Sequence, residues 1–340
     1  MARPKWRSQA QSSDNKVQVR WSLEEAFQLF LRAKRLEQLK PRTIEDHERH
    51  FVYLTRWLKS EHPDINYVDQ VTTDTIRDYL DFMLMDEDNE EQDTTARTYG
   101  TGLLPVTVNV RLRTLKTLFR WLTAEGFCQE NPTQNIHLLR TEEDTNQGFT
   151  TEQIALLLAQ PDLSTYVGFR DYALMLFLLD TGARIRETLS LTASNIDFIN
   201  YTVQFSSEVT KTRKPRIVPV SQKTINCIKE LLAENKEHFG EKAEHIFLGI
   251  YGSPMDPSTI RHRLREYGEP AGIENVCRVS PHTFRHTFGR LYIRNGGDVF
   301  TLQKILGHST MEMVRKYVQM AQEDLQDAHA KFSPLNNLKL

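Results

Sequence analysis

The amino-acid sequence predicts a mainly α-helical protein with a small β-sheet (α+β). It is expected to have an N-terminal helical domain and a C-terminal, mostly helical domain that carries three strands. The length of 340 residues favours two domains over one, and apolar residues recur at helical spacing through most of the chain. Three short β-like runs, at 201–205, 216–220 and 245–248, lie in the second half, where the first two flank a basic turn as in a hairpin.

The composition is that of an ordinary soluble globular protein, with 39% hydrophobic and 26% charged residues. The longest apolar run, 172–179, is too short to cross a bilayer. The first residues, MARPKWRSQAQ, lack the apolar segment of a secretory signal. Three cysteines, Cys128, Cys227 and Cys277, are widely spaced and odd in number. We therefore expect a cytoplasmic protein without a disulfide framework or a zinc ribbon.

Residues 21–135 are predicted to form a domain of four or five helices, after a flexible basic arm at 1–20. Helical periodicity begins at Ser22, and Thr43 is expected to cap the second helix. The last of these helices is expected to end at Gly126. The residues expected to face the core are Leu23, Phe27, Phe30, Leu31, Phe51, Leu54, Leu58, Ile76, Tyr79, Leu80, Met83, Leu112, Leu115, Phe119 and Leu122.

A second domain is predicted over 149–323, after an exposed linker at 136–148 that includes TEEDTNQG. It begins with a short helix at 151–158 and a strongly apolar helix at 170–179. Gly182 can close the apolar helix in the left-handed conformation that glycine adopts without steric cost. The three β-like runs and further helices complete the domain.

Local clusters of charge lie behind the net charge of −2. Six acidic residues fall within the eight positions 86–93 and offset basic segments elsewhere. One basic cluster lies along a predicted helix and another in the hairpin loop, and both are predicted to contact DNA. Solvated surface without a ligand is the alternative. The cluster members are Arg111, Arg113, Lys116 and Arg120 on the helix, and Lys211, Arg213, Lys214 and Arg216 in the loop. Arg213 and Lys214 are the loop residues predicted to contact DNA.

Five residues combine two guanidiniums, two imidazoles and one phenol. They are Arg184, His282, Arg285, His308 and Tyr317, in the strings TGARIRETLSL, SPHTFRHTF and LGHSTMEMVRKYV. A guanidinium can hold a phosphate through paired hydrogen bonds, an imidazole can move a proton, and a tyrosine oxygen can act as a covalent nucleophile. The combination suggests covalent phosphoryl transfer on a phosphodiester.

The pair His282 and Arg285 is expected at a helix N-terminus. Ser280-Pro281 is a typical helix start, and residues three apart lie on one face. Backbone N–H groups and the helix dipole favour an anion at that position. The sequence therefore predicts that both side chains are displayed there toward an anionic ligand.

Two further predictions concern Tyr317 and Arg184. The string Ser309 to Glu312 has a capping-box pattern, so a helix is expected from about Thr310. Its apolar stripe is expected to contain Met311, Val314 and Val318, with Tyr317 on the flank. Arg184 is expected near the core, where an arginine needs a partner. Glu187, one helical turn later, is the predicted supporting residue. A purely structural ion pair between Arg184 and Glu187 is the alternative.

A metal site is the alternative interpretation of the histidines. His282 and His286 lie four apart on a predicted helix, and His308 could be a third ligand. However, the segment lacks the glutamate of an H-E-x-x-H metallopeptidase, and Arg285 would repel a cation. We therefore expect no metal and no other cofactor.

In order and local context, these strings resemble the motifs of the tyrosine recombinases of the phage integrase family. The N-terminal helical region resembles, in layout, the core-binding (SAM-like) DNA-binding domain of that family. The hairpin string KTRKPRIVPV lacks the glycines common in the family's lysine turn, so Lys214 is an alternative to Lys211. The catalytic set that the resemblance implies is Arg184, Lys211, His282, Arg285, His308 and, as the nucleophile, Tyr317.

The resemblance implies a site-specific recombinase that cuts and rejoins double-stranded DNA through a 3′-phosphotyrosyl intermediate. The exchange would integrate or excise a mobile element, or resolve DNA. The implied partners are recombination sites, a homotetramer on two sites and an accessory DNA-bending protein, in the cytoplasm at the nucleoid. A type IB-like topoisomerase and a DNA-binding regulator that keeps the fold are the alternatives. The tail at 324–340 is expected to dock on a neighbouring protomer or to pack on its own chain.

Overall fold

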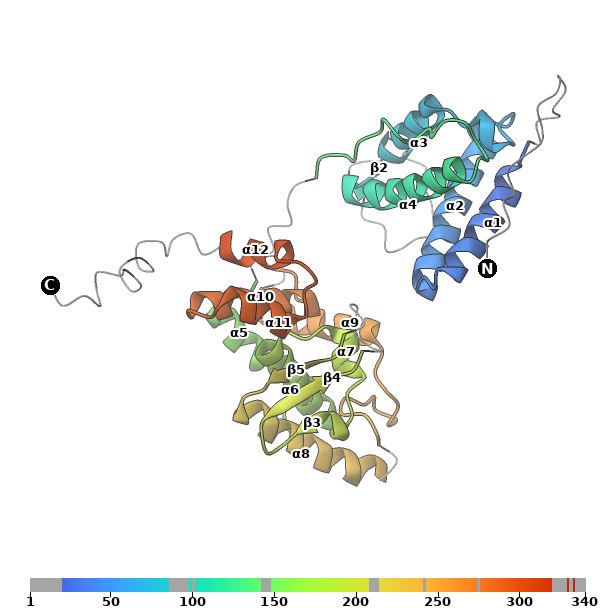
Figure 1. Ribbon diagram of the computed structural model, residues 1–340. Coiled ribbons are helices and arrows are strands. Elements are labelled where there is room, and N and C mark those ends of the chain that lie inside the picture. The colour runs from blue at the N-terminus through green and yellow to red at the C-terminus, as the bar shows by residue number, and fades with distance from the viewer. Residues whose placement is uncertain are drawn as a thin grey trace, which may run out of the picture. The chain divides into compact units, whose positions relative to one another are not determined.

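The computed structural model divides into two compact units, Met1–Glu143 and Asp144–Leu340 (Figure 1). The residues that it describes are 20–85, 98–99, 102–141, 148–207, 214–240, 243–273, 276–319, 329 and 333. The basic arm and most of the tail lie outside these residues. Within them, no helix has the length and apolar character that a membrane crossing requires.

The first unit is helical, as its periodicity predicts. Its helices are α1 (Leu23–Leu36), α2 (Pro41–Glu61), the short η1 (Val68–Gln70), α3 (Thr73–Met85) and α4 (Pro105–Ala124). Two short strands, β1 (Thr98–Tyr99) and β2 (Gly102–Leu103), pair in antiparallel fashion before α4. All fifteen residues that the periodicity places inside are buried, so the predicted helical faces are confirmed.

The first two helices of this unit begin in different ways, α1 with a side-chain cap and α2 with a proline. Ser22 caps α1 and forms a capping box with Glu25, whose backbone N–H donates to the Ser22 hydroxyl. The prediction of Thr43 as the cap of α2 is wrong. The helix begins at Pro41, with Lys40 as a cap that makes no side-chain hydrogen bond, because proline is favoured in the first turn, where its missing N–H costs nothing.

The chain after α4 remains attached to the first unit. Ile136 is buried in its core, and the Asn109 side chain bonds both backbone groups of Leu139, accepting from its N–H at 2.8 Å and donating to its carbonyl at 2.9 Å. The first part of the stretch predicted as a linker is therefore fixed to α4 by side-chain contacts.

The second unit is mostly helical around a three-stranded antiparallel sheet of order β3-β4-β5. α6 packs against both α8 and α10, and α10, α11 and α12 pack against one another (Figure 1). The strands are β3 (Ile196–Asp197), β4 (Thr202–Phe205) and β5 (Arg216–Pro219). The helices are α5 (Thr151–Leu158), α6 (Tyr166–Thr181), α7 (Ile185–Leu189), the short η2 (Ala193–Asn195), α8 (Gln222–Phe239), α9 (Pro257–Gly268), α10 (Pro281–Arg294), α11 (Val299–Leu306) and α12 (Glu312–Gln319).

One predicted strand is wrong. The run 245–248 makes only isolated bridges at its ends, and the third strand of the sheet is β3 instead. Ile246 is fully buried; its N–H donates to the Leu191 carbonyl, and its own carbonyl accepts from the Asn235 side chain. An apolar run of four residues fits a buried connecting segment as well as a strand, and only tertiary contacts decide between them.

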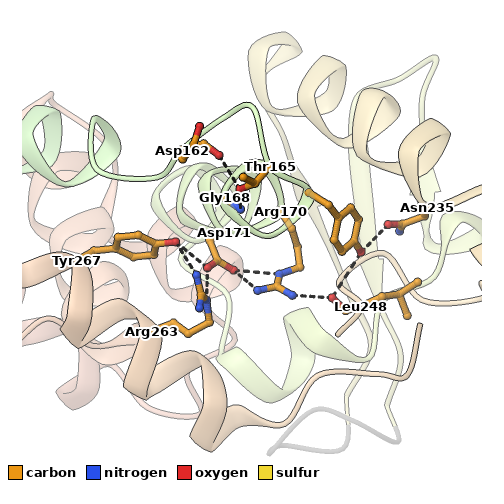
Figure 2. Close-up of polar contacts among 10 residues, drawn as sticks. Asp162, Thr165, Gly168, Arg170, Asp171, Asn235, Leu248, Arg263 and Tyr267 are labelled. Carbon is orange, nitrogen blue, oxygen red and sulfur yellow. Dashed lines mark hydrogen bonds and ion pairs between the residues drawn. The ribbon is translucent and has the colours of Figure 1, made fainter. Parts of the chain in front are cut away.

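In the second unit, a buried polar network links α6 with α9 and with the 245–248 segment (Figure 2). Asp171 on α6 accepts from Arg170 at 2.7 Å and from the Tyr267 hydroxyl at 2.9 Å, and it also accepts from Arg263 on α9. Arg170 donates further to the Leu248 carbonyl at 2.9 Å. The carboxylate is thus paired with two guanidiniums, so the burial of Asp171 and Arg170 is compensated. The network holds α9 and the 245–248 segment against α6.

Candidate active site

Arg184 lies at the N-cap of α7, immediately after α6 ends. Gly182 ends α6 with φ of 60°, and a Cβ at this position would collide with the side chains of Phe288 and Leu306. The turn therefore requires glycine for both its conformation and its space. The turn places Arg184 next to Glu187. Oε1 of Glu187 accepts from the Arg184 Nη1 at 3.1 Å, and Oε2 accepts from the Arg184 backbone N–H at 3.2 Å.

Glu187 is a buried carboxylate between two arginines. Its second guanidinium partner is Arg216 on β5, which donates from Nη2 at 2.6 Å. Burial by itself raises the pKa of Glu187, but the hydrogen bond and charge of Arg216, together with Arg184, outweigh it and hold the pKa below its ordinary value. Glu187 is therefore ionised, and its ion pair with Arg184, which both sequence interpretations predict, is present.

Arg285 on α10 is buried rather than displayed, which corrects the prediction for the pair His282 and Arg285. Its Nη1 donates to the Gly182 carbonyl at 2.7 Å and its Nη2 to the Leu306 carbonyl at 2.8 Å. These two bonds use two of its five N–H groups. Burial, reinforced by the like charge of Arg184, lowers the pKa of Arg285 to about 9. The side chain stays protonated at neutral pH, and an anionic ligand would relieve both effects.

His282 is the exposed member of that pair. It lies in the first turn of α10, which Ser280 caps by accepting from the Thr283 N–H. Partial desolvation of the ring, followed by the charges of Arg285 and Arg184, lowers the pKa of His282 below its ordinary value. At neutral pH the ring is therefore neutral and able to accept a proton.

His308 lies in the turn between α11 and α12. Gly307 ends α11 with φ of 63°, and the next N–H, that of His308, donates to the Gln303 carbonyl at 3.1 Å. The Gln303 side chain in turn donates to the His308 carbonyl at 3.3 Å. The backbone of His308 is thereby held on both sides, which fixes where the half-buried ring leaves the chain.

Tyr317 is almost completely buried, with 1% of its surface exposed. The His308 ring lies parallel to the phenol ring at 6.4 Å between centroids, and the His286 ring meets it edge-on at 5.5 Å. Gly289 on α10 lies under the phenol, since a Cβ there would come within 2.9 Å of its ring atoms. Burial raises the pKa of Tyr317, whereas the charges of Arg285 and Arg184 act in the opposite direction.

The helix that carries Tyr317 begins later than predicted. α12 starts at Glu312 rather than at about Thr310, and Met311, expected in the apolar stripe, is 37% exposed. The first three residues of the predicted capping box, Ser309 to Met311, lie in the turn between His308 and α12. Val314 is buried as expected, and Tyr317 lies deeper than the flank position that the sequence suggests.

The basic hairpin loop is only partly described. Lys211 and Arg213 lie outside the described residues, and Lys214 is exposed two residues before β5. The residue that sequence reasoning missed is Arg216, which contacts Glu187 from the first position of β5. Strand alternation carries a signal for it, because Arg216 is two positions from the buried Val218 and so lies on the inward face.

The four basic residues of α4 do not form one open surface. Arg113 and Arg120 are exposed. Arg111 is buried, with its guanidinium over the Tyr53 ring at 4.2 Å, and Lys116 donates to the Thr133 carbonyl at 2.6 Å. DNA contact from α4 therefore stays a prediction that depends chiefly on Arg113 and Arg120.

His282, His286 and His308 do not form a metal site in the part of the chain that the structure describes. Among the described residues, no group of three His, Cys, Asp or Glu side chains could hold a metal ion. His286 and His308, two members of the alternative metal set, lie instead against the ring of Tyr317.

Three comparisons place the chain among known proteins. It matches the phage integrase family over residues 147–324. Among curated proteins, it is 30% identical to the tyrosine recombinase XerD of Chlorobaculum tepidum over 239 residues, covering 68% of this chain and 77% of the relative. It is 28% identical to the tyrosine recombinase XerC of Chlamydia caviae over 229 residues, covering 67% and 72%. The fold is similar to the Tn1549 transposon integrase in complex with a circular intermediate DNA, with a TM-score of 0.69 and 19% identity, covering 90% of this chain and 99% of that one.

Proposed function

Because this chain belongs to the phage integrase family and is a tyrosine site-specific recombinase, we propose that Tyr317 is the nucleophile with which it cuts and rejoins DNA. One observation carries this proposal: the Tyr317 phenol lies close to His308 and within the influence of two arginines. The His308 ring lies parallel to the phenol ring at 6.4 Å between centroids, and the charges of Arg285 and Arg184 lower the pKa of the phenol against the effect of burial. A phosphate beside that phenol would meet the guanidiniums that an in-line displacement needs.

In the proposed reaction, the Tyr317 oxygen attacks the scissile phosphorus in line and the bond from phosphorus to the 5′-oxygen breaks. The product is a 3′-phosphotyrosyl bond and a free 5′-hydroxyl, and the reverse attack of a 5′-hydroxyl reseals DNA without ATP. Arg184 and Arg285 stabilise the nonbridging oxygens, and His308 donates a hydrogen bond to them. Lys211 protonates the leaving oxygen, and the neutral His282 accepts the phenol proton.

The finer role that we propose is strand exchange between two copies of a short DNA site by four protomers, with an accessory DNA-bending protein, at the bacterial nucleoid. The exchange integrates or excises a mobile element or resolves DNA. Curated relatives named XerC and XerD, together with a structural neighbour from the Tn1549 transposon, support this range of roles. Inverted repeats around a short spacer in the DNA beside the gene would identify the site.

The deciding experiment supplies two duplexes that carry the site and measures recombinant products, with EDTA present. We expect recombinants and an unchanged rate in EDTA, because the two arginines supply the positive charge that a metal ion supplies in other phosphoryl transfers. Relaxation of supercoiled DNA without recombinant products would show a topoisomerase instead, and site binding without any covalent complex would show a regulator. Loss of activity in EDTA would contradict the metal-free reaction.

A further inference from the structure

Arg216, the first residue of β5, makes side-chain hydrogen bonds to two elements outside the sheet. Its side chain is 9% exposed and lies over the ring of Phe205, its partner across the sheet, at 4.3 Å. From that position Nη2 donates to Glu187 at 2.6 Å and Nε donates to the Ile305 carbonyl at 3.0 Å. One guanidinium therefore joins the sheet to α7 and to the last turn of α11.

Each of these contacts leads to a residue of the proposed catalytic set. Glu187 is the partner of Arg184. The Ile305 carbonyl precedes the Leu306 carbonyl that accepts from Arg285, and the turn that presents His308 follows directly. Gly307 in that turn approaches the Arg216 side chain so closely that a Cβ would come 3.2 Å from its Cδ.

The sharing of Glu187 determines how Arg184 is held. Arg216 and the Arg184 backbone N–H both donate to Oε2, so the Arg184 side chain makes its ion pair through Nη1 and Oε1 alone. A carboxylate that is not shared tends to bind a guanidinium through both oxygens. Without Arg216, Glu187 would be free to take Arg184 in this bidentate manner, and it would neutralise more of the Arg184 charge.

We propose that Arg216 is a positioning residue for DNA cleavage, which keeps Arg184 available to the scissile phosphate and fixes the turn of His308. The inference rests on the proposed function, because it assigns Arg184 and His308 to that phosphate. Arg216 itself is buried and bonded on two sides, so its effect on the phosphate passes through Glu187 and through the end of α11.

The test uses the full-length protein and a nicked site that traps the covalent complex, at saturating DNA. Arg216→Met removes the charge and keeps most of the apolar length. We expect the single-turnover cleavage rate to fall about 10- to 100-fold, which is the effect of misplacing a catalytic group. The dissociation constant for the site should stay within about twofold of wild type, because a buried residue makes no DNA contact. Arg294→Met, an exposed arginine at the end of the same unit's α10, should cleave like wild type.

A second substrate separates positioning from general damage to the fold. A methylphosphonate at the scissile position replaces one nonbridging oxygen with methyl and removes the negative charge that Arg184 holds. The defect of Arg216→Met should shrink on this substrate. Arg216→Lys keeps the charge but lacks the planar fork that reaches two acceptors, and it should show a smaller defect with the same substrate dependence, even if the methionine variant folds poorly.

If the cleavage rate of Arg216→Met fell equally on both substrates, by the same factor as its fraction of folded protein, the role of Arg216 would be purely structural and the proposal would be overturned. Cleavage by Arg216→Met at the rate of Arg294→Met would also overturn it. Failure of the proposed function would look different, because wild-type protein itself would then form no covalent complex.

Discussion

At the scale of single residues, Arg285 serves the fold and the proposed chemistry with one side chain. Two of its N–H groups hold the carbonyls of Gly182 and Leu306, which end the helices that lead to Arg184 and to His308. The remaining N–H groups can serve a phosphate. A buried arginine with its orientation fixed in this way needs little reorganisation when an anion arrives, which is the property expected of an electrostatic catalyst.

Gly289 provides a residue-scale prediction about the buried nucleophile. Gly289→Ala places a methyl group within 2.9 Å of the Tyr317 ring, at a cost of about 1–3 kcal/mol for overpacking, which exceeds the ~1 kcal/mol that alanine adds to helix propensity. We expect the thermal unfolding midpoint to fall and Tyr317 to become exposed. Nitration of Tyr317 by tetranitromethane, located by mass spectrometry, measures that exposure.

The matched control is Gly249→Ala, where the added methyl would meet nothing closer than 3.5 Å. This variant should keep the wild-type nitration of Tyr317. Equal nitration in the two variants would mean that Gly289 does not hold the phenol in place.

At the scale of elements, α12 must move for the proposed reaction to occur. With 1% of Tyr317 exposed, a DNA phosphate cannot reach its oxygen while α12 packs on α10 as it does in this structure. The segment before the helix, Ser309 to Met311, is exposed and separates α12 from the fixed turn of His308. A shift of α12 on this connection would bring out Tyr317 and leave His308 in place.

The sequence was informative about elements wherever local rules decide them. The predicted helix at 151–158 is α5 with the same bounds, and Gly182 adopts the left-handed conformation expected of it. The third strand and the burial of Arg285 were mispredicted because partners distant in sequence decide them. The starts of α2 and α12 were also mispredicted, by about two or three residues. The Gly182 carbonyl that receives Arg285 lies 103 positions away from it, and no periodicity reports such a contact.

His50 on α2 gives an element-scale prediction on pH. It is buried beside Arg111 and bonded to the Thr114 hydroxyl at 2.8 Å. Burial, with the charge of Arg111, lowers its pKa to about 4 from 6.5. The unfolded state therefore binds more protons between these values, so stability is present above pH 6.5 and falls as pH falls toward 4. Between 6.5 and about 4, at about 1.4 kcal/mol per pH unit, the loss of stability is at most ~3.5 kcal/mol.

Urea unfolding at pH 7.5 and pH 5, followed by tryptophan fluorescence, measures this effect in the first unit, where all four tryptophans of the chain lie. His50→Gln cannot titrate and should lose less stability between the two pH values than wild type. His137→Gln, at an exposed position of the same unit, should behave like wild type. An unchanged pH dependence in His50→Gln would exclude His50 as the source.

At the scale of the whole molecule, charge is distributed to specific places on a chain whose net charge is only −2. Arg184 and Arg216 pair with one carboxylate, Glu187, in the second unit, where Arg285 adds a further buried charge, and α4 presents Arg113 and Arg120 in the first. Overall charge therefore predicts little about DNA binding, whereas the position of each cation on its element predicts more.

The exposed arginines of α4 give the prediction at this scale. Arg113→Gln and Arg120→Gln should each weaken DNA binding and reduce the slope of log affinity against log salt by about 0.9, the value expected when the protein neutralises one phosphate fewer. Fluorescence anisotropy of a labelled duplex over a series of KCl concentrations measures the slope. Arg77→Gln, which removes an arginine already paired with Asp74, should leave it unchanged. Identical slopes in all three variants would remove α4 from the DNA interface.

The central claim, that Tyr317 is the nucleophile, is tested most directly by locating the covalent bond. The protein is trapped on a nicked site, the DNA is digested, and the peptide that carries the nucleotide is identified by mass spectrometry. We expect the adduct on Tyr317, its loss in Tyr317→Phe, and its retention in Tyr292→Phe, a tyrosine of the same hydrophobic cluster. An adduct on any other residue, or one that persists in Tyr317→Phe, would contradict the account.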